Sequence, residues 1–328
     1  MNNSILQKSI PANSGRLMHY EFIDIISELV KKHGQKFINY RREWDLAANC
    51  EFAPEKPLYI ALETNSNCNF KCKMCLHSFD IRTEKETKSI DLDTAKKLFV
   101  QTKELNIPSI NIGAFTECTI NKNIKSILKI ASETGTMDRF LFTNGSMLCQ
   151  NFCDYLVDLE WERVYISLDA ANEITYKKIR GYDLNKVEQN VLCLMETKKR
   201  KKTLFPIVRV SFVIQPENKN EVDEFYCKWE NKVDVIDFQK LIDHTKKNQS
   251  VDDFIFKKCQ GPFTTLAVTC EGEIIPCCSE YGKELSLGNL KDMSIIEAWN
   301  CEKMQMLRKA FLEKANIPQI CQICLRDV

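Results

Sequence analysis

Three cysteines spaced as C-x3-C-x2-C form the group with the clearest chemistry in this chain. Cys68, Cys72 and Cys75 follow directly after the apolar run Leu58–Leu62. Thiolates at this spacing on one loop can hold three irons of a [4Fe-4S] cube and leave the fourth iron without a protein ligand. An open iron can bind and reduce a substrate, which a cluster used only for electron transfer does not need. The alternative is a structural zinc site in which His77 supplies the fourth ligand.

A second group of cysteines lies near the C-terminus. Cys259 precedes a predicted β-hairpin, Cys277 and Cys278 end that hairpin, and Cys321-x-x-Cys324 follows at the end of the chain. Four thiolates from two elements can ligate all four irons of a second cluster. Such a cluster cannot chelate a substrate, so its expected role is to accept an electron. A structural zinc ribbon is the alternative.

Polar residues also stand where other short apolar runs end. Gly113-Ala114-Phe115-Thr116-Glu117 follows one run, and Thr143-Asn144-Gly145 makes a tight turn after the next. Ser167-x-Asp169 ends a third run, and the alternation of strand side chains predicts that both residues lie on one face. Arg180 comes a little later. Its planar guanidinium suits a two-pronged contact with a carboxylate better than a lysine would.

In this order the pieces resemble the radical S-adenosylmethionine (SAM) superfamily, over residues 57 to 328. In that superfamily the open iron chelates SAM, and one electron cleaves SAM to methionine and a 5′-deoxyadenosyl radical. The radical then abstracts a hydrogen atom from an unactivated C–H bond. The resemblance implies that Cys68, Cys72 and Cys75 hold the SAM-binding [4Fe-4S] cluster. It also implies a SAM site that comprises Ala114, Glu117, Thr143, Asn144, Ser167, Asp169 and Arg180.

The resemblance gives several of these residues a role. The segment with Ala114 and Glu117 occupies the place of a Gly-Gly-Glu-Pro motif whose backbone binds the amino group of SAM. This motif is degenerate here, because Thr116 replaces a glycine and Cys118 replaces the proline. Ser167 and Asp169 are expected at the ribose hydroxyls, and Arg180 at the SAM carboxylate.

The C-terminal cysteines resemble those of SPASM and twitch domains. Cys277 directly follows Pro276, as in the Gly-x-Ile/Val-x-Pro-Cys pattern of those domains, so it is preferred over Cys278 as a ligand. SPASM domains proper carry two auxiliary clusters and need about seven ligands, whereas this tail offers one C-x-x-C. The resemblance therefore implies one auxiliary [4Fe-4S] cluster, held by Cys259, Cys277, Cys321 and Cys324.

The elements that must position these residues alternate between strand and helix. The predicted fold is α/β, a partial (β/α)6 TIM-like barrel followed by a small cluster-binding domain of a β-hairpin and a helix. The active site of such a sheet lies at the carboxyl ends of its strands, where the first cysteines stand. The predicted strands are Leu58–Glu63, Ser109–Gly113, Arg139–Thr143, Val164–Asp169, Ile207–Ile214 and Val235–Gln239, and the predicted helices are Leu92–Glu104, Ile124–Glu133, Leu148–Leu159, Leu184–Thr197 and Glu217–Trp229.

Three parts follow from this pattern. Residues 1–56 form an N-terminal preface, in which the apolar spacing of Tyr20–Val30 predicts a helix. Residues 57–244 form the partial barrel, and residues 245–328 form the auxiliary cluster domain. In the last part, Thr264–Thr269 and Ile274–Pro276 read as a hairpin, and Ser294-x-x-Glu297 predicts a capping box that opens a helix.

Composition narrows the function classes. The chain of 328 residues carries 46 basic and 45 acidic residues, so no global field favours nucleic acid or a membrane surface as a partner. The basic run Lys198–Lys202 is predicted to be a solvated turn. Sixteen cysteines without a signal peptide or a long apolar segment indicate a reducing compartment, the cytoplasm.

These observations predict a radical SAM oxidoreductase that acts on a small polyhydroxylated or sugar-like substrate. Its auxiliary cluster would accept an electron from the substrate radical, and a flavodoxin- or ferredoxin-type protein would reduce the first cluster. The alternative is a SPASM-type enzyme that modifies a peptide. By position alone, Lys240, Asp243 and His244 are candidates for deprotonating the substrate radical.

Overall fold

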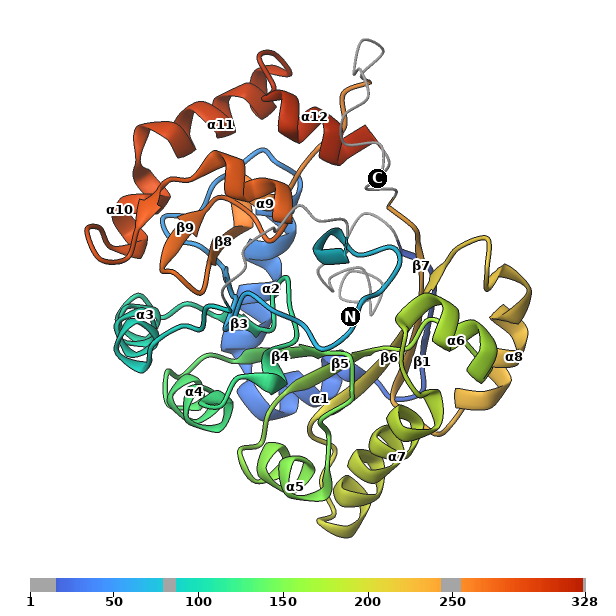
Figure 1. The fold of residues 1–328 in the computed structure, drawn as a ribbon. Coiled ribbons are helices and arrows are strands. Elements are labelled where there is room, and N and C mark those ends of the chain that lie inside the picture. Colours follow the sequence, from blue (N-terminus) through green and yellow to red (C-terminus); the bar gives the residue numbers. More distant parts are fainter. Residues whose placement is uncertain (1–15, 79–86, 243–254, 327–328) are drawn as a thin grey trace.

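One mixed sheet organises the chain. The computed structural model describes residues 16–78, 87–242 and 255–326. Within them ten strands form a single sheet in the order β1-β7-β6-β5-β4-β3-β2-β8-β9-β10. The strands β2 to β7 are mutually parallel, and β1 and β10 lie at opposite edges, so the described sheet does not close. Figure 1 shows helices α3, α4, α5, α7 and α8 on its outer side.

The six predicted strands and the five predicted helices are present, although the last of these helices begins at Val222, five residues later than predicted. Each strand lies within two residues of its predicted ends, because short runs of apolar β-formers between turn residues give a strong local signal. The parallel strands are β2 (Tyr59–Leu62), β3 (Ser109–Ile112), β4 (Asp138–Thr143), β5 (Arg163–Ser167), β6 (Ile207–Ile214) and β7 (Val235–Lys240). The helices between these strands are α3 (Leu92–Glu104) after β2, α4 (Ile124–Ser132) after β3, α5 (Gln150–Asp158) after β4, α6 (Glu173–Arg180) and α7 (Leu184–Arg200) after β5, and α8 (Val222–Trp229) after β6. Helix α6 was not predicted.

The preface differs from its prediction at its start. Tyr20 belongs to strand β1 (Arg16–Glu21), which pairs antiparallel with β7. The edge of the sheet provides the hydrogen-bond partners that decide for a strand here, which local apolar spacing cannot reveal. Helices α1 (Ile25–His33) and α2 (Gln35–Ala48) follow. The ring of Trp44 on α2 meets Tyr59 on β2 edge to face, with centroids 6.1 Å apart.

The C-terminal hairpin forms as predicted, but it also extends the main sheet. Strand β8 (Thr265–Val268) follows α9 (Gly261–Thr264) and pairs parallel with β2, so a seventh parallel strand comes from the tail. Strand β9 (Glu273–Ile275) returns antiparallel to β8 and is followed by β10 (Gly288–Asn289). The capping box at Ser294 and Glu297 opens α10 (Ile295–Asn300), as predicted, and α11 (Glu302–Glu313) and α12 (Gln319–Arg326) end the described chain.

Candidate active site

The cysteine triplet lies on the loop that leaves β2. Cys72 is buried, and Cys68 and Cys75 are half-buried. Burial, together with the nearby groups Glu117, Cys72 and Cys75, raises the pKa of the Cys68 thiol to about 11, against the hydrogen bond from the backbone of Phe70. The three thiols therefore share one environment, as the ligands of one cluster must. Because a thiol binds iron as a thiolate, these cysteines would release their protons when the cluster is loaded.

The last turn of α6 fixes the cysteine loop. The backbone N–H of Lys73 donates to the carbonyl of Ile179 at 2.9 Å. The ring of Phe70 stacks on Tyr182, with centroids 4.5 Å apart. Arg180 Nη1 lies 3.2 Å from the sulfur of Cys72. A cation directed at a thiolate of the triplet stabilises its charged, metal-binding form.

Arg180 also forms an ion pair with Asp169, and both side chains are buried. Burial raises the pKa of Asp169, while the charge of Arg180 and the N–H of Val213, at 2.7 Å, oppose that rise. The strand ends at Ser167, so Asp169 lies beyond it with a positive φ of 66°. The prediction that the strand continues to Asp169 is therefore wrong, and the strand alternation that put Asp169 on one face with half-buried Ser167 does not apply beyond Ser167. Arg180 and Asp169 are brought together, with Ser167 two residues away.

Glu117 is the hub of a second group of predicted residues. Its buried carboxylate accepts hydrogen bonds from Thr143 Oγ1 at 2.7 Å and from the backbone N–H of Asn144 at 2.6 Å, besides the hydroxyl and N–H of Thr119. Burial raises the pKa of Glu117, and these hydrogen bonds counteract the rise. Asn144 Nδ2 in turn lies 2.9 Å from Asn69 Oδ1 and 4.0 Å from the sulfur of Cys68. Glu117 thus orients the end of β4 toward the triplet.

The backbone conformation and the lack of space at position 113 require the glycine that precedes Ala114. Its φ is 104°, and a Cβ at this position would lie 2.3 Å from the carbonyl oxygen of Phe142. A side chain would therefore displace β4. The backbone N–H groups of Gly113 and Ala114 both approach the carbonyl of Leu62, at 3.2 Å. These contacts hold the Ala114 loop against the strand that leads into the cysteine triplet.

The tail cysteines also converge. Burial, together with nearby Cys324 and Cys321, raises the pKa of Cys259 to about 12. Burial likewise raises the pKa of Cys277, with added contributions from Cys259 and Cys324. A Cβ on Gly261 would lie 2.9 Å from Cβ of Cys277 and 3.5 Å from the sulfur of Cys259, so glycine allows these two thiols to approach. Four thiolates are the ligand set of a [4Fe-4S] cluster, and the donor set fits one.

In the described part of the chain, no three Cys, His, Asp or Glu side chains stand close enough together to hold a single metal ion.

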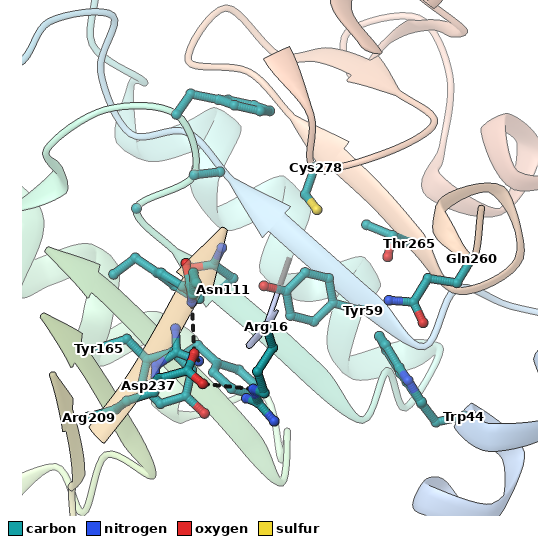
Figure 2. A pocket seen from close by; sticks show the side chains of 16 residues that line it. Arg16, Trp44, Tyr59, Asn111, Tyr165, Arg209, Asp237, Gln260, Thr265 and Cys278 are labelled. Atoms are coloured by element: carbon teal, nitrogen blue, oxygen red, sulfur yellow. Dashed lines mark hydrogen bonds and ion pairs between the residues drawn. The ribbon is translucent and has the colours of Figure 1, made fainter. Parts of the chain in front are cut away.

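A pocket of about 220 Å³ lies within the curve of the sheet (Figure 2). One part of its wall is Gly113, Ala114 and Phe115, from the predicted SAM loop. Cys278 contributes from the tail side. Cys278 therefore lines the pocket, and it also lies near Cys324, as its neighbour Cys277 does. The choice of Cys277 as the ligand stays a prediction. The rest of the wall is Arg16, Trp44, Tyr59, Asn111, Phe140, Phe142, Tyr165, Arg209, Asp237, Gln239, Gln260 and Thr265.

Sequence reasoning missed the charged side chains of this pocket. Asp237 interrupts the apolar strand β7, and Arg209 interrupts β6. A charged residue inside an otherwise apolar parallel strand is a usable signal, because a buried charge must be paired. Among the predicted candidates for deprotonation, Lys240 ends β7, and Asp243 and His244 lie outside the described residues.

Two family profiles match the chain. That of the radical SAM superfamily matches residues 62–226, half of the chain, and that of the SPASM iron–sulfur cluster-binding domain matches residues 259–325. The chain therefore belongs to the radical SAM superfamily, with a SPASM domain at its C-terminal side. Its cofactors are SAM, the [4Fe-4S] cluster that binds SAM, and auxiliary [4Fe-4S] iron–sulfur in the SPASM domain. None of the described helices has the length and apolar character needed to span a membrane.

Known relatives differ in substrate. The chain is 24% identical to a tungsten-containing aldehyde ferredoxin oxidoreductase cofactor-modifying protein of Pyrococcus furiosus, with 82% of this chain and 88% of that protein covered. It is 22% identical to the SAM-dependent 2-deoxy-scyllo-inosamine dehydrogenase of Niallia circulans, with 77% and 86% covered. The fold is similar to that of Streptococcus suis SuiB bound to its precursor peptide SuiA, with a TM-score of 0.61, 12% identity and coverage of 91% and 75%.

Replacing Arg180 with alanine is expected to weaken SAM binding by ~10- to 150-fold, or about 1.5–3 kcal/mol. The change removes a charged donor from the site and leaves Asp169 buried without its cation. Isothermal titration of reconstituted enzyme with SAM measures the effect. Arg200→Ala is the matched control, because that guanidinium pairs with Asp154 at an exposed position. Unchanged SAM affinity in an Arg180→Ala enzyme with full iron content would contradict the assignment.

Proposed function

We propose that this protein is a radical SAM dehydrogenase that oxidises a secondary alcohol of a small, sugar-like substrate to a ketone. When bound, the first cluster and SAM supply the 5′-deoxyadenosyl radical. Cys68, Cys72 and Cys75 would hold that cluster, and Arg180 and Asp169 would complete the SAM site from α6 and the end of β5. A flavodoxin- or ferredoxin-type donor would provide the electron that cleaves SAM.

The reaction balances as a two-electron oxidation of the substrate. The carbinol carbon loses a hydrogen atom, which appears in 5′-deoxyadenosine. The hydroxyl then loses a proton to a base, and the remaining substrate radical gives up one electron as the C=O bond forms. We assign the acceptance of that electron to the auxiliary cluster held by Cys259, Cys277, Cys321 and Cys324. One electron would enter at SAM cleavage and one would leave to the auxiliary cluster, from which it would return to the flavodoxin- or ferredoxin-type carrier. SAM is then the net oxidant and is consumed once per turnover.

The pocket carries this proposal. It has the Gly113–Phe115 loop of the predicted SAM site in one wall and Cys278, the neighbour of an auxiliary ligand, in another. A substrate there would lie between the source of the radical and the acceptor of the electron. A volume of about 220 Å³ is below the ~300–1,000 Å³ of pockets for drug-sized ligands. This size supports a molecule comparable to a single sugar or cyclitol ring.

Peptide modification is the competing function. It rests on the likeness to SuiB, which at 12% identity supports a common fold only. The 22% identical dehydrogenase acts, by its name, on an inosamine, and the small pocket of this chain agrees in size with a substrate of one such ring.

The test is transfer of deuterium from substrate to SAM. Reconstituted enzyme, SAM and dithionite are incubated with a panel of cyclitols and monosaccharides that carry deuterium at the carbinol carbons. The expected result is 5′-deoxyadenosine with one deuterium and an equimolar ketone, detected by mass spectrometry. Deuterium transfer from a labelled peptide, with none from the panel, would replace this proposal with peptide modification.

A further inference from the structure

The pocket contains more positive than negative charge, and we infer that it binds the carboxylate of a small polyhydroxylated acid. This inference rests on the proposed function and narrows its substrate from neutral sugar-like molecules to hexuronates, aldonates or cyclitol acids. Arg16 and Arg209 are the residues that would bind the carboxylate.

Asp237 organises the charged part of the pocket. Its carboxylate lies 2.7 Å from Arg16 Nε and 3.1 Å from Arg209 Nη1. It also accepts from Gln239 Nε2 at 2.7 Å and contacts His19 Nδ1 at 3.1 Å. Burial raises the pKa of Asp237, but the hydrogen bond with His19 and the charges of Arg209 and Arg16 bring it to about 2. Asp237 is therefore a carboxylate at any working pH.

In this wall the single carboxylate of Asp237 forms ion pairs with two guanidinium groups, those of Arg16 and Arg209. Arg16, Arg209 and Asp237 are the charged side chains among the described residues that line the pocket, so its lining carries one excess positive charge. Glu21, 2.7 Å from His19 Nε2, lies on the other side of that ring and is not part of the pocket lining. Elsewhere in the barrel, the buried Arg163 forms an ion pair with Asp138. A buried excess cation is costly unless an anion joins it.

Arg209 is held ready for a further partner. Its side chain is 8% exposed, and its guanidinium carbon lies 3.6 Å from the ring centroid of Tyr165, which fixes the plane of the group. Within the described residues, Arg209 Nε has no hydrogen-bond partner, and neither has the buried Oδ1 of Asn111 in the same pocket. A carboxylate would satisfy the guanidinium, and a substrate hydroxyl would satisfy the amide oxygen.

These groups come from strands that are adjacent only in the folded sheet. Tyr165 on β5 is in register with Arg209 on β6, and Arg16 on β1 is in register with Gln239 on β7. Figure 2 shows Arg16, Arg209 and Asp237 grouped together, with Cys278 apart from them across the pocket. A substrate anchored by its carboxylate would thus extend its ring hydroxyls toward the remaining walls.

The experiment compares acids with neutral counterparts of similar shape. Reconstituted enzyme with SAM is titrated calorimetrically with quinate against myo-inositol, and with D-glucuronate against D-glucose. At least one acid is expected to bind about 10- to 150-fold more tightly than its neutral partner, as a charged hydrogen-bonded pair provides. Equal affinity within both pairs, or no binding of either acid at millimolar concentration, would overturn the inference.

Variants locate the effect. Arg209→Gln and Arg16→Gln should each reduce the preference for the acid at least ~10-fold, and Arg209→Lys should restore part of it. Arg200→Gln, on the exposed surface, should leave it unchanged. Arg16 is the safer probe of the two, because its side chain is 22% exposed and Asp237 keeps Arg209 when it is replaced. A full acid preference in folded Arg16→Gln and Arg209→Gln enzymes would overturn the assignment.

SAM cleavage separates this inference from the proposed function. If the parent enzyme forms 5′-deoxyadenosine but binds acids no more tightly than their neutral counterparts, the carboxylate site is rejected and the dehydrogenase proposal stands. Absence of SAM cleavage in the parent enzyme would reject the dehydrogenase proposal itself.

Discussion

Cys72→Ala is expected to abolish formation of 5′-deoxyadenosine completely. Three thiolates are the minimum that holds a cube with one open iron, and the buried Cys72 is the thiol that Arg180 contacts. The measurement is anaerobic incubation of reconstituted enzyme with SAM and dithionite, followed by chromatography. The parent enzyme should produce 5′-deoxyadenosine slowly even without substrate.

Iron content provides the control for this prediction. One cluster on the triplet and one in the tail amount to about eight irons and eight sulfides in the parent protein. A variant with Cys68, Cys72 and Cys75 all replaced by alanine should retain about four of each. Cys193→Ala is a matched control on the outer helix α7 and should keep both iron and activity. Zinc in place of iron in both proteins, or continued SAM cleavage in Cys72→Ala, would contradict the assignment of the triplet.

Loss of the auxiliary cluster is expected to separate radical generation from product formation. With Cys321 and Cys324 both replaced by alanine, the enzyme should still cleave SAM at close to the parent rate but form little ketone. The substrate radical would lack its electron acceptor. Turnover is followed by the ratio of ketone to 5′-deoxyadenosine, which should fall from about one to near zero under the proposed one-to-one stoichiometry. Circular dichroism must accompany the assay, because a metal site in a small domain can contribute to folding.

The neighbouring cysteines sharpen this test. Cys277→Ala should lose the tail cluster, since Cys277 stands with Cys259 and Cys324. Cys278→Ala should keep about four tail irons, because Cys278 lines the pocket. The reverse result would move the ligand by one residue. A folded tail variant without its cluster that still oxidises substrate at the parent rate would assign that cluster a structural role only.

Local signals in the sequence determined most of the architecture. The six parallel strands and their helices follow from short apolar runs, amphipathic spacing and turn residues, all of which act within about ten positions. The two cysteine groups were equally readable, because their spacing along the chain is itself the requirement of a cluster. The capping box at Ser294 formed as expected for the same reason: both partners lie within one turn.

Contacts that depend on long-range pairing were decided by the tertiary structure alone. Tyr20 joins a strand because β7 offers an edge, and Lys198, predicted to be solvated in a turn, is buried in an ion pair with Asp234. Asp169 lies beyond the end of β5 and meets Arg180. Arg16 and Arg209 share Asp237 only because antiparallel β1 closes onto β7 in one register. Sheet order and register bring distant residues together, and neither is encoded in any local window of the sequence.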